Sequence, residues 1–126
     1  MPRYLTLFKY NAEGRKGLMK EKAAAREAAL KLTVESAGGR LELINWAAPG
    51  SEYSGISIGE FPDAGSCAAV FGLIEATGMF SEIKIIELLT ASEIDHGLAK
   101  ISDLSRSWSL AVPRLAGATL IAFTLS

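Results

Sequence analysis

His96 is the only histidine in the chain, and histidine is the side chain best suited to proton transfer near neutral pH. It follows Glu93 and Asp95 at the expected start of a helix. An exposed helix residue just after a capping box explains the same pattern, and we prefer that interpretation. A single histidine cannot supply an imidazole metal site, and the spacing of a His–Cys zinc site is absent. The sequence therefore predicts no metal centre, and no residue pattern implies a cofactor.

Two further groups could carry chemistry only if the fold perturbed them. Glu87 falls in an apolar segment that resembles a central strand, where burial would raise its pKa and make it a base. The alternative, which we prefer, is that Glu87 faces solvent near a strand end, or pairs with Lys84 or Lys9. Cys67 lies among alanine and valine residues without an evident base, so we interpret it as a buried apolar residue rather than a nucleophile.

A third set of residues suggests a binding space. Gly55, Ser57 and Gly59 would fall on one side of an extended strand, where they leave room for a ligand or for a partner's side chains. Aromatic residues elsewhere could wall such a space and offer hydroxyl or indole donors. The alternative, which we prefer, is that they pack in the core and in a dimer interface. The predicted ligand-binding residues are Tyr4, Tyr10, Trp46, Tyr53 and Ser57, and those considered for catalysis are Tyr53, Glu87 and His96.

The elements that must position these residues follow a β-α-β-β-α-β order, which is the ferredoxin-like α+β pattern with an antiparallel sheet. Asn11 and Asp63 are expected helix caps, and Thr90 with Glu93 fits a capping box. A further helix and strand would extend the pattern at the C-terminal end. The expected strands are 3–10, 40–48, 53–61, 79–89 and 115–125, and the expected helices are 12–37, 63–77 and one from residue 91 to 105 or beyond.

The expected strands carry apolar residues on both faces. Leu5 and Leu7 alternate with Tyr4, Phe8 and Tyr10 in the first strand. Two helices can cover only one face of a four-stranded sheet, so the other face would be a large exposed apolar patch. A second copy of the same sheet is the simplest cover, since twofold homodimers are the commonest oligomers. The pattern therefore predicts a homodimer or a higher homo-oligomer.

Length and composition exclude several classes of protein. The chain has 126 residues, of which 49% are apolar and 21% charged, as is typical of one globular domain. A net charge of −1 makes no case for binding nucleic acid or a membrane surface. One cysteine cannot form an internal disulfide, and no segment has the form of a signal peptide or a membrane span. We therefore expect a cytoplasmic protein that binds neither nucleic acid nor a membrane.

Four stretches of the chain, taken together, resemble the GYD domain family, which is related to the dimeric α/β-barrel proteins. They are 10–20 at the first strand–helix junction, 34–42 at the turn into the second strand, Trp46, and 88–93 after the fourth strand. The resemblance implies a dimeric α/β barrel but no particular reaction, because related proteins include monooxygenases, isomerases and haem-handling proteins. The family's Gly-Tyr-Asp triplet corresponds here to Glu52-Tyr53-Ser54, so Ser54 would supply a neutral version of any role of the aspartate.

We expect a GYD-like domain at 1–99 and an extension at 100–126 that packs on the same domain or its partner. Two functions are open. The first is a homo-oligomeric small-molecule-binding or scaffold protein. The second is a cofactor-independent enzyme, similar to a monooxygenase or an isomerase, that acts on a small apolar or aromatic metabolite in the barrel. We favour the first, because the sequence offers no convincing acid–base, nucleophile or metal set.

Overall fold

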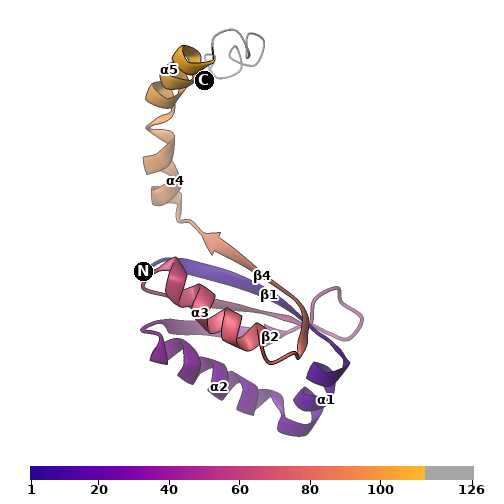
Figure 1. Cartoon of the computed structure of the whole chain (residues 1–126). Helices are drawn as coiled ribbons and strands as arrows, with labels where there is room; N and C mark the ends of the chain where they lie inside the picture. Colours follow the sequence, from indigo (N-terminus) through magenta and orange to yellow (C-terminus); the bar gives the residue numbers. More distant parts are fainter. Residues whose placement is uncertain (113–126) are drawn as a thin grey trace. The chain divides into compact units, whose positions relative to one another are not determined.

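The computed structural model describes residues 1–112, and its elements follow the expected ferredoxin-like order (Figure 1). Residues Met1–Leu88 form one compact unit, and Leu89 begins a second. The first unit holds an antiparallel sheet in the strand order β2-β3-β1-β4. Its elements are β1 (Arg3–Tyr10), α1 (Ala12–Glu21), α2 (Ala23–Ser36), β2 (Arg40–Trp46), β3 (Gly55–Glu60), α3 (Ala64–Glu75) and β4 (Phe80–Leu88).

The predicted caps are confirmed. The Asn11 side-chain oxygen accepts a hydrogen bond from the Gly14 N–H at 2.9 Å, and Asp63 accepts one from the Ser66 N–H at 2.7 Å. The backbone hydrogen bond from Ser66 also lowers the pKa of Asp63. Each side chain satisfies an amide that the first helical turn leaves without a partner, which fixes where the helix begins.

The single helix expected over 12–37 is wrong, because the chain breaks at Lys22. This residue has φ 77° and ψ 154°, a backbone conformation that essentially only glycine adopts freely. Its N–H still donates to the Leu18 carbonyl at 2.9 Å and so ends α1. Residues 12–37 are nearly all helix formers, so local preference alone gives no signal for the break.

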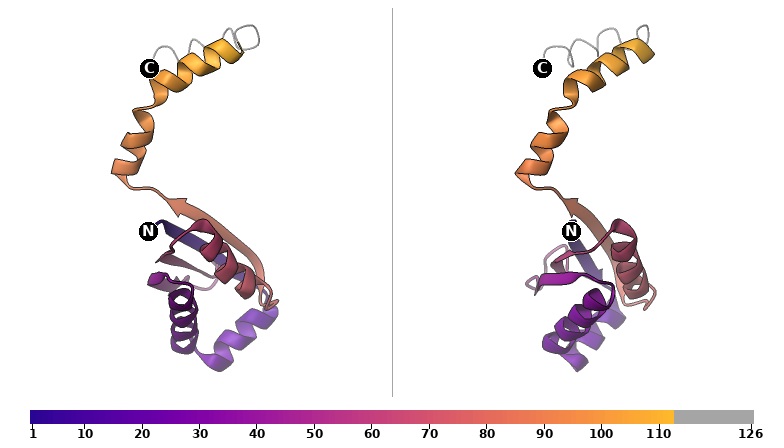
Figure 2. Two further views of the ribbon diagram at one scale, coloured as in Figure 1. Left: turned by 60° about the vertical axis from the view of Figure 1, so that its left-hand side comes forward. Right: turned by 90° about the vertical axis from the view of Figure 1, so that its left-hand side faces the viewer.

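The two faces of the sheet differ. Along β1 the even-numbered residues from Tyr4 to Tyr10 are buried and the odd-numbered ones are half-buried. Helices α2 and α3 cover the face that carries the even-numbered residues, as Figure 2 shows. Strand residues directly opposite one another share a face, so Gly55, Ser57 and Gly59 of β3 lie under the helices. The core cluster on this side is Tyr4, Val34, Phe61, Cys67, Val70 and Phe71.

The open face of the sheet is apolar in its middle and charged toward both ends, with Lys9, Glu82 and Lys84 near one end and a cluster around Arg3 at the other. Arg3 makes a two-pronged contact with Glu42, at 3.0 and 2.8 Å, which lowers the pKa of that carboxyl. Arg40 lies 3.6 Å from Glu42 and 3.4 Å from Glu60. The strand register places seven apolar side chains on this face: Leu5, Leu7, Leu43, Ile56, Ile58, Ile86 and Leu88.

The second unit contains α4 (Ala91–Leu98) and α5 (Ile101–Ala111). The capping box of Thr90 and Glu93 at the start of α4 is confirmed, with both hydrogen bonds at 3.1 Å. The expectation of one helix from 91 to 105 or beyond is wrong, because a turn at Ala99 and Lys100 separates α4 from α5. The strand expected at 115–125 lies outside the described residues. Among the described helices, none is long and apolar enough to cross a membrane.

Candidate functional site

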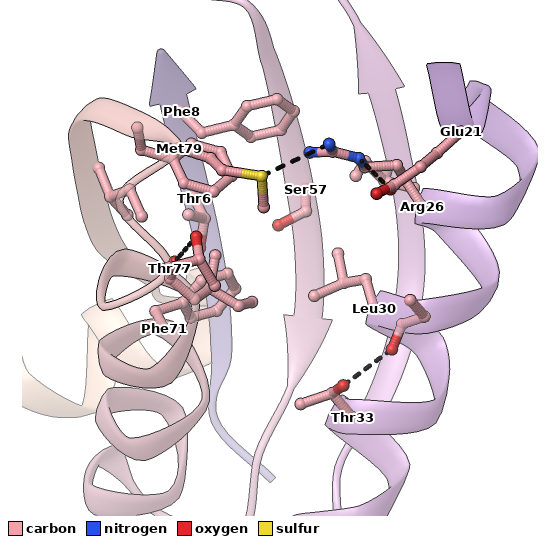
Figure 3. Close-up of a pocket in the computed structure, with 15 residues that line it drawn as sticks. Thr6, Phe8, Glu21, Arg26, Leu30, Thr33, Ser57, Phe71, Thr77 and Met79 are labelled. Atoms are coloured by element: carbon pink, nitrogen blue, oxygen red, sulfur yellow. Dashed lines mark hydrogen bonds and ion pairs between the residues drawn. The ribbon is translucent and has the colours of Figure 1, made fainter. Parts of the chain in front are cut away.

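A pocket of about 210 Å³ lies within the first unit, between the sheet and helices α2 and α3 (Figure 3). Its walls are mostly apolar, and its polar groups are few and come from different elements, as is typical of small-molecule sites. The lining residues are Thr6, Phe8, Glu21, Arg26, Ala29, Leu30, Thr33, Ile44, Ser57, Phe71, Ile74, Thr77, Met79, Phe80 and Ile83.

Two hydroxyl-bearing residues form the sheet side of the pocket. Thr6 on β1 and Ser57 on β3 are directly opposite in the strand register and are both buried. The Thr6 Oγ1 atom has no hydrogen-bond partner within the part of the chain that the structure describes. A buried hydroxyl without a partner is costly, since it has lost its hydrogen bonds to water. A polar group of a ligand is one way to satisfy it.

The hydroxyls of the helix side are already engaged. Thr33 donates to the Ala29 carbonyl at 2.8 Å, and Thr77 donates to the Ile74 carbonyl at 2.6 Å. These are local contacts within one turn of each helix. Among the described pocket residues, the groups that can still form hydrogen bonds to a ligand are therefore mainly those on the sheet side and Arg26.

Arg26 is the charged residue that reaches furthest into the lining. It stands in the first turn of α2, and its guanidinium extends toward the Met79 sulfur, with Nη2 3.6 Å from that atom (Figure 3). Its Nε donates to a Glu21 carboxylate oxygen at 3.0 Å. The guanidinium also lies over the Tyr10 ring, 5.4 Å from the ring centroid. Only 10% of the Arg26 side chain is exposed.

Gly17 on α1 makes room for this guanidinium. A Cβ atom built on Gly17 would overlap Arg26 Nη2. The sequence Glu13-Gly14-Arg15-Lys16-Gly17 is therefore a stretch in which glycines allow close approach to α1. The Arg26 side chain occupies the space that Gly17 leaves open.

Of the five predicted ligand-binding residues, Ser57 lines the pocket. Tyr10 lies directly behind the wall: its ring stacks on Phe80 with centroids 5.0 Å apart, and its hydroxyl accepts from Trp46 Nε1 at 3.3 Å. Tyr4 belongs to the core and meets Phe61 edge-on at 5.9 Å. Burial first, and the neighbouring Glu87 carboxylate second, raise the pKa of Tyr4.

The structure does not bring together the three residues considered for catalysis. Tyr53 lies in the loop before β3, where the Lys84 ammonium is 5.7 Å from its ring centroid. Its hydroxyl is the largest influence that raises the pKa of Lys84, ahead of Glu82. His96 is exposed on α4 in the second unit.

Glu87 is not a buried base on a central strand, and its position agrees with the preferred alternative that it faces solvent near a strand end. β4 is an edge strand, and Glu87 is exposed on it. Lys84 forms its ion pair with Glu82 at 3.5 Å rather than with Glu87. Cys67 is 2% exposed, and burial raises the pKa of its thiol to about 11, which makes the thiolate scarce at neutral pH.

Ser57 is the one predicted residue in the lining, and the pocket residues that sequence reasoning missed include Arg26, Thr6 and Met79. Arg26 sits in a stretch rich in alanine, lysine and glutamate, where a charged residue is usually solvated. The signal that could have found it is its helical spacing from Leu30, Thr33 and Val34, which all face inward on α2. Within residues 1–112, no three His, Cys, Asp or Glu side chains gather where they could hold a metal ion.

An antiparallel sheet of order β2-β3-β1-β4 with two helices on one face defines a ferredoxin-like α+β protein. The chain belongs to the GYD domain family, whose sequence profile matches residues 4–98. A search among curated proteins found no match.

Solved structures with a similar backbone fold share little sequence identity with this chain. A 5-chloro-2-hydroxyhydroquinone dehydrochlorinase from Burkholderia phenoliruptrix AC1100, in complex with 2,5-dihydroxybenzoquinone, is 12% identical, with a TM-score of 0.49 over 71% of this chain and 96% of that chain. An uncharacterized NIPSNAP domain protein from Burkholderia xenovorans is 14% identical, with a TM-score of 0.42 over 72% of this chain and 95% of that one.

Proposed function

We propose that this chain is a small-molecule-binding protein whose ligand occupies the pocket between the sheet and helices α2 and α3. The observation that carries the proposal is the buried Thr6 hydroxyl, which lacks a partner among the described residues and lies on the sheet side of a largely apolar pocket. Cavities that serve only packing are dry and apolar, whereas a binding site combines apolar walls with a few polar groups. The ligand is a small, largely apolar molecule with a polar group that fits the Thr6 and Ser57 hydroxyls.

Binding without catalysis is the better supported of the two expected functions. Tyr53, Glu87 and His96 do not line this pocket. The titratable residues in its lining are Glu21 and Arg26, which are paired with each other. An arginine does not release its proton in proteins, so it serves as an anchor rather than as a base.

The binding proposal is tested with 2-naphthamide, an uncharged aromatic probe whose fluorescence reports its environment. Wild-type protein is expected to bind it saturably. Leu30→Trp places a large side chain in the pocket and is expected to abolish binding. Leu32→Trp is the matched control, because Leu32 lies on the same helix with 67% of its surface exposed. Absence of saturable binding, or equal binding by the two variants, would overturn the proposal.

The proposal includes self-association through the open face of the sheet. Its support is the set of seven apolar side chains there, which the helices of the same unit leave uncovered. Leu5 lies at the centre of this set, between Ile58 and Ile86 in the register. A dimer that buries such a patch against a second copy would remove it from water.

Light scattering after size-exclusion chromatography tests this association. The wild type is expected to have twice the mass of one chain or more, and Leu5→Glu is expected to shift it to one chain. Leu32→Glu, with the same change at an exposed helix position, is expected to leave the mass unchanged. A wild type that elutes as a single chain at all concentrations would rule the association out.

A further inference from the structure

We infer that the ligand of this pocket is an apolar acid, whose carboxylate binds Arg26 in place of Glu21. The inference rests on the proposed binding function and adds the chemical class of the ligand. It follows from the position of one guanidinium, from the quality of its present partners, and from what lines the rest of the space.

The first step is the position of Arg26. Its side chain is nine-tenths buried, and it projects from α2 into the lining rather than into solvent. Burying a guanidinium is unfavourable unless its charge and its donors are matched. Gly17 leaves the space for this arrangement, and a Cβ atom there would collide with Nη2. The backbone of α1 is thus adapted to keep the charge inside.

The second step is that the present partners satisfy the guanidinium poorly. A guanidinium has five N–H donors and matches a carboxylate through two parallel hydrogen bonds. Here Nε meets one Glu21 oxygen at 3.0 Å, and Nη2 meets the Met79 sulfur at 3.6 Å, which is a weak acceptor. The Tyr10 ring, 5.4 Å from the guanidinium, stabilises the charge but does not provide the two carboxylate oxygens that the donors match. By contrast, Arg3 and Glu42 of the same unit form the full two-pronged contact. The Arg26 site therefore has unused capacity for an oxyanion.

The third step is that Glu21 is easily replaced. Its side chain is 56% exposed, so water can solvate it once it leaves Arg26. Ion pairs with an exposed partner contribute little to stability, and exchange of one carboxylate for another costs little. A ligand carboxylate held inside the pocket would gain more than Glu21 loses, because water is excluded there.

The fourth step is the body of the ligand. Beyond Arg26, the lining is formed by side chains such as Phe8, Leu30, Ile44 and Phe71. An inorganic anion or a highly polar acid would leave these walls without a partner. A carboxylate on an aromatic or branched aliphatic body matches both the charge and the walls.

The test compares 2-naphthoate with 2-naphthamide, two probes of nearly identical shape that differ in charge. Wild-type protein is expected to bind the acid at least about tenfold more tightly than the amide, as a charged hydrogen-bonded pair requires. Arg26→Gln is expected to abolish this preference, so that the variant binds the acid and the amide with similar affinity. Arg15→Gln is the matched control, because it removes the same charge from an exposed position on α1 and keeps the preference.

Glu21→Gln provides a second test, in which binding of the acid is expected to become tighter rather than weaker. Removing the competing carboxylate is expected to tighten binding of 2-naphthoate by about two- to fivefold relative to binding of 2-naphthamide by the same variant. A purely structural role of the Glu21–Arg26 pair would not improve the binding of the acid alone. This variant keeps the inference testable even if Arg26→Gln fails to fold.

The outcomes separate the two proposals. Equal, saturable binding of both probes that Leu30→Trp abolishes would overturn the acid inference and leave the binding function in place. A preference for the acid that survives Arg26→Gln would also overturn it. Binding of neither probe would overturn the binding function and, with it, the inference.

Discussion

Gly14 of α1 lies directly against the backbone carbonyl of Met79, just before β4. A Cβ atom on Gly14 would overlap that oxygen and the Tyr10 ring. Two hydrogen bonds fix the same junction: the Asn11 N–H donates to the Met79 carbonyl at 3.0 Å, and Asn11 Nδ2 donates to the Gly78 carbonyl at 2.6 Å. The Asn11 side chain and Gly78 are 67 residues apart in the chain, and this contact holds the start of α1 against the segment just before β4.

We expect Gly14→Ala to destabilise the protein by about 2 kcal/mol or more, because backbone must move to admit the methyl group. Gly72→Ala is the matched control: a Cβ atom on Gly72 meets nothing within 4 Å in the interior of α3. That change is expected to stabilise by about 0.5–1 kcal/mol, through helix propensity. Urea unfolding of the two variants measures both values, and similar values would contradict the packing described for Gly14.

Lys22 offers a stabilising substitution. Its positive φ places a long side chain in a region that costs about 1–3 kcal/mol for residues other than glycine. Lys22→Gly is expected to raise the free energy of unfolding by about 1 kcal/mol, even though glycine loses more entropy on folding. Lys20→Gly, inside α1, is expected to lower it by about 1 kcal/mol. Thermal unfolding distinguishes them, and a destabilised Lys22→Gly would show that the residue is not strained.

Thr6→Val is expected to stabilise the unliganded protein by about 1–2 kcal/mol, because it replaces a buried, unpartnered hydroxyl with a methyl group of the same shape. The same variant is expected to bind 2-naphthamide more weakly. Thr33→Val removes a hydroxyl that already has a partner, so no stabilisation is expected there. Denaturant unfolding and fluorescence titration measure the two effects, and a destabilised Thr6→Val would mean that the hydroxyl is already satisfied.

We expect ionisation of the Cys67 thiol to lower the free energy of unfolding at high pH. Burial raises the pKa of its thiol from an ordinary 9.0 to about 11. Between these values the folded protein holds a proton that the unfolded chain has lost, so this contribution to stability is complete below pH 9 and is lost as pH rises through 11. Cys67→Ala is expected to remove that part of the pH dependence. The free energy of unfolding of both proteins is measured from pH 8 to 11. If it falls with pH in parallel for the two proteins, Cys67 makes no contribution to the pH dependence.

The elements that local chemistry dictates were predictable. Asn11, Asp63 and Thr90 each bond to an amide three residues on, so the sequence around each suffices to place a helix start. The break at Lys22 was not predictable, because no glycine or proline marks it. It depends on how α1 packs against Tyr10, at the end of β1, and against Met79, which lies far away in the sequence.

The candidate site was predictable in part. Ser57 sits between Gly55 and Gly59, and this run of small residues on one side of a strand points to free space. Thr6 escaped notice because it stands between the large residues Tyr4 and Phe8 on the same face, which predict solid packing. The pocket forms where the helices meet that face, and the spacing of those helices is a tertiary property.

The Arg26 side chain has a dynamic consequence, because its partners stand on separate elements: Glu21 ends α1, and Met79 precedes β4. An acid that took the place of Glu21 would remove an ion pair that joins α1 to α2. Amide hydrogens of α1 would then exchange faster with deuterium as occupancy rises, while those of β1 and β3 beneath the pocket would exchange more slowly. Hydrogen exchange of α1, the helix that contributes Glu21 to the lining, would thus report how much of the pocket is occupied.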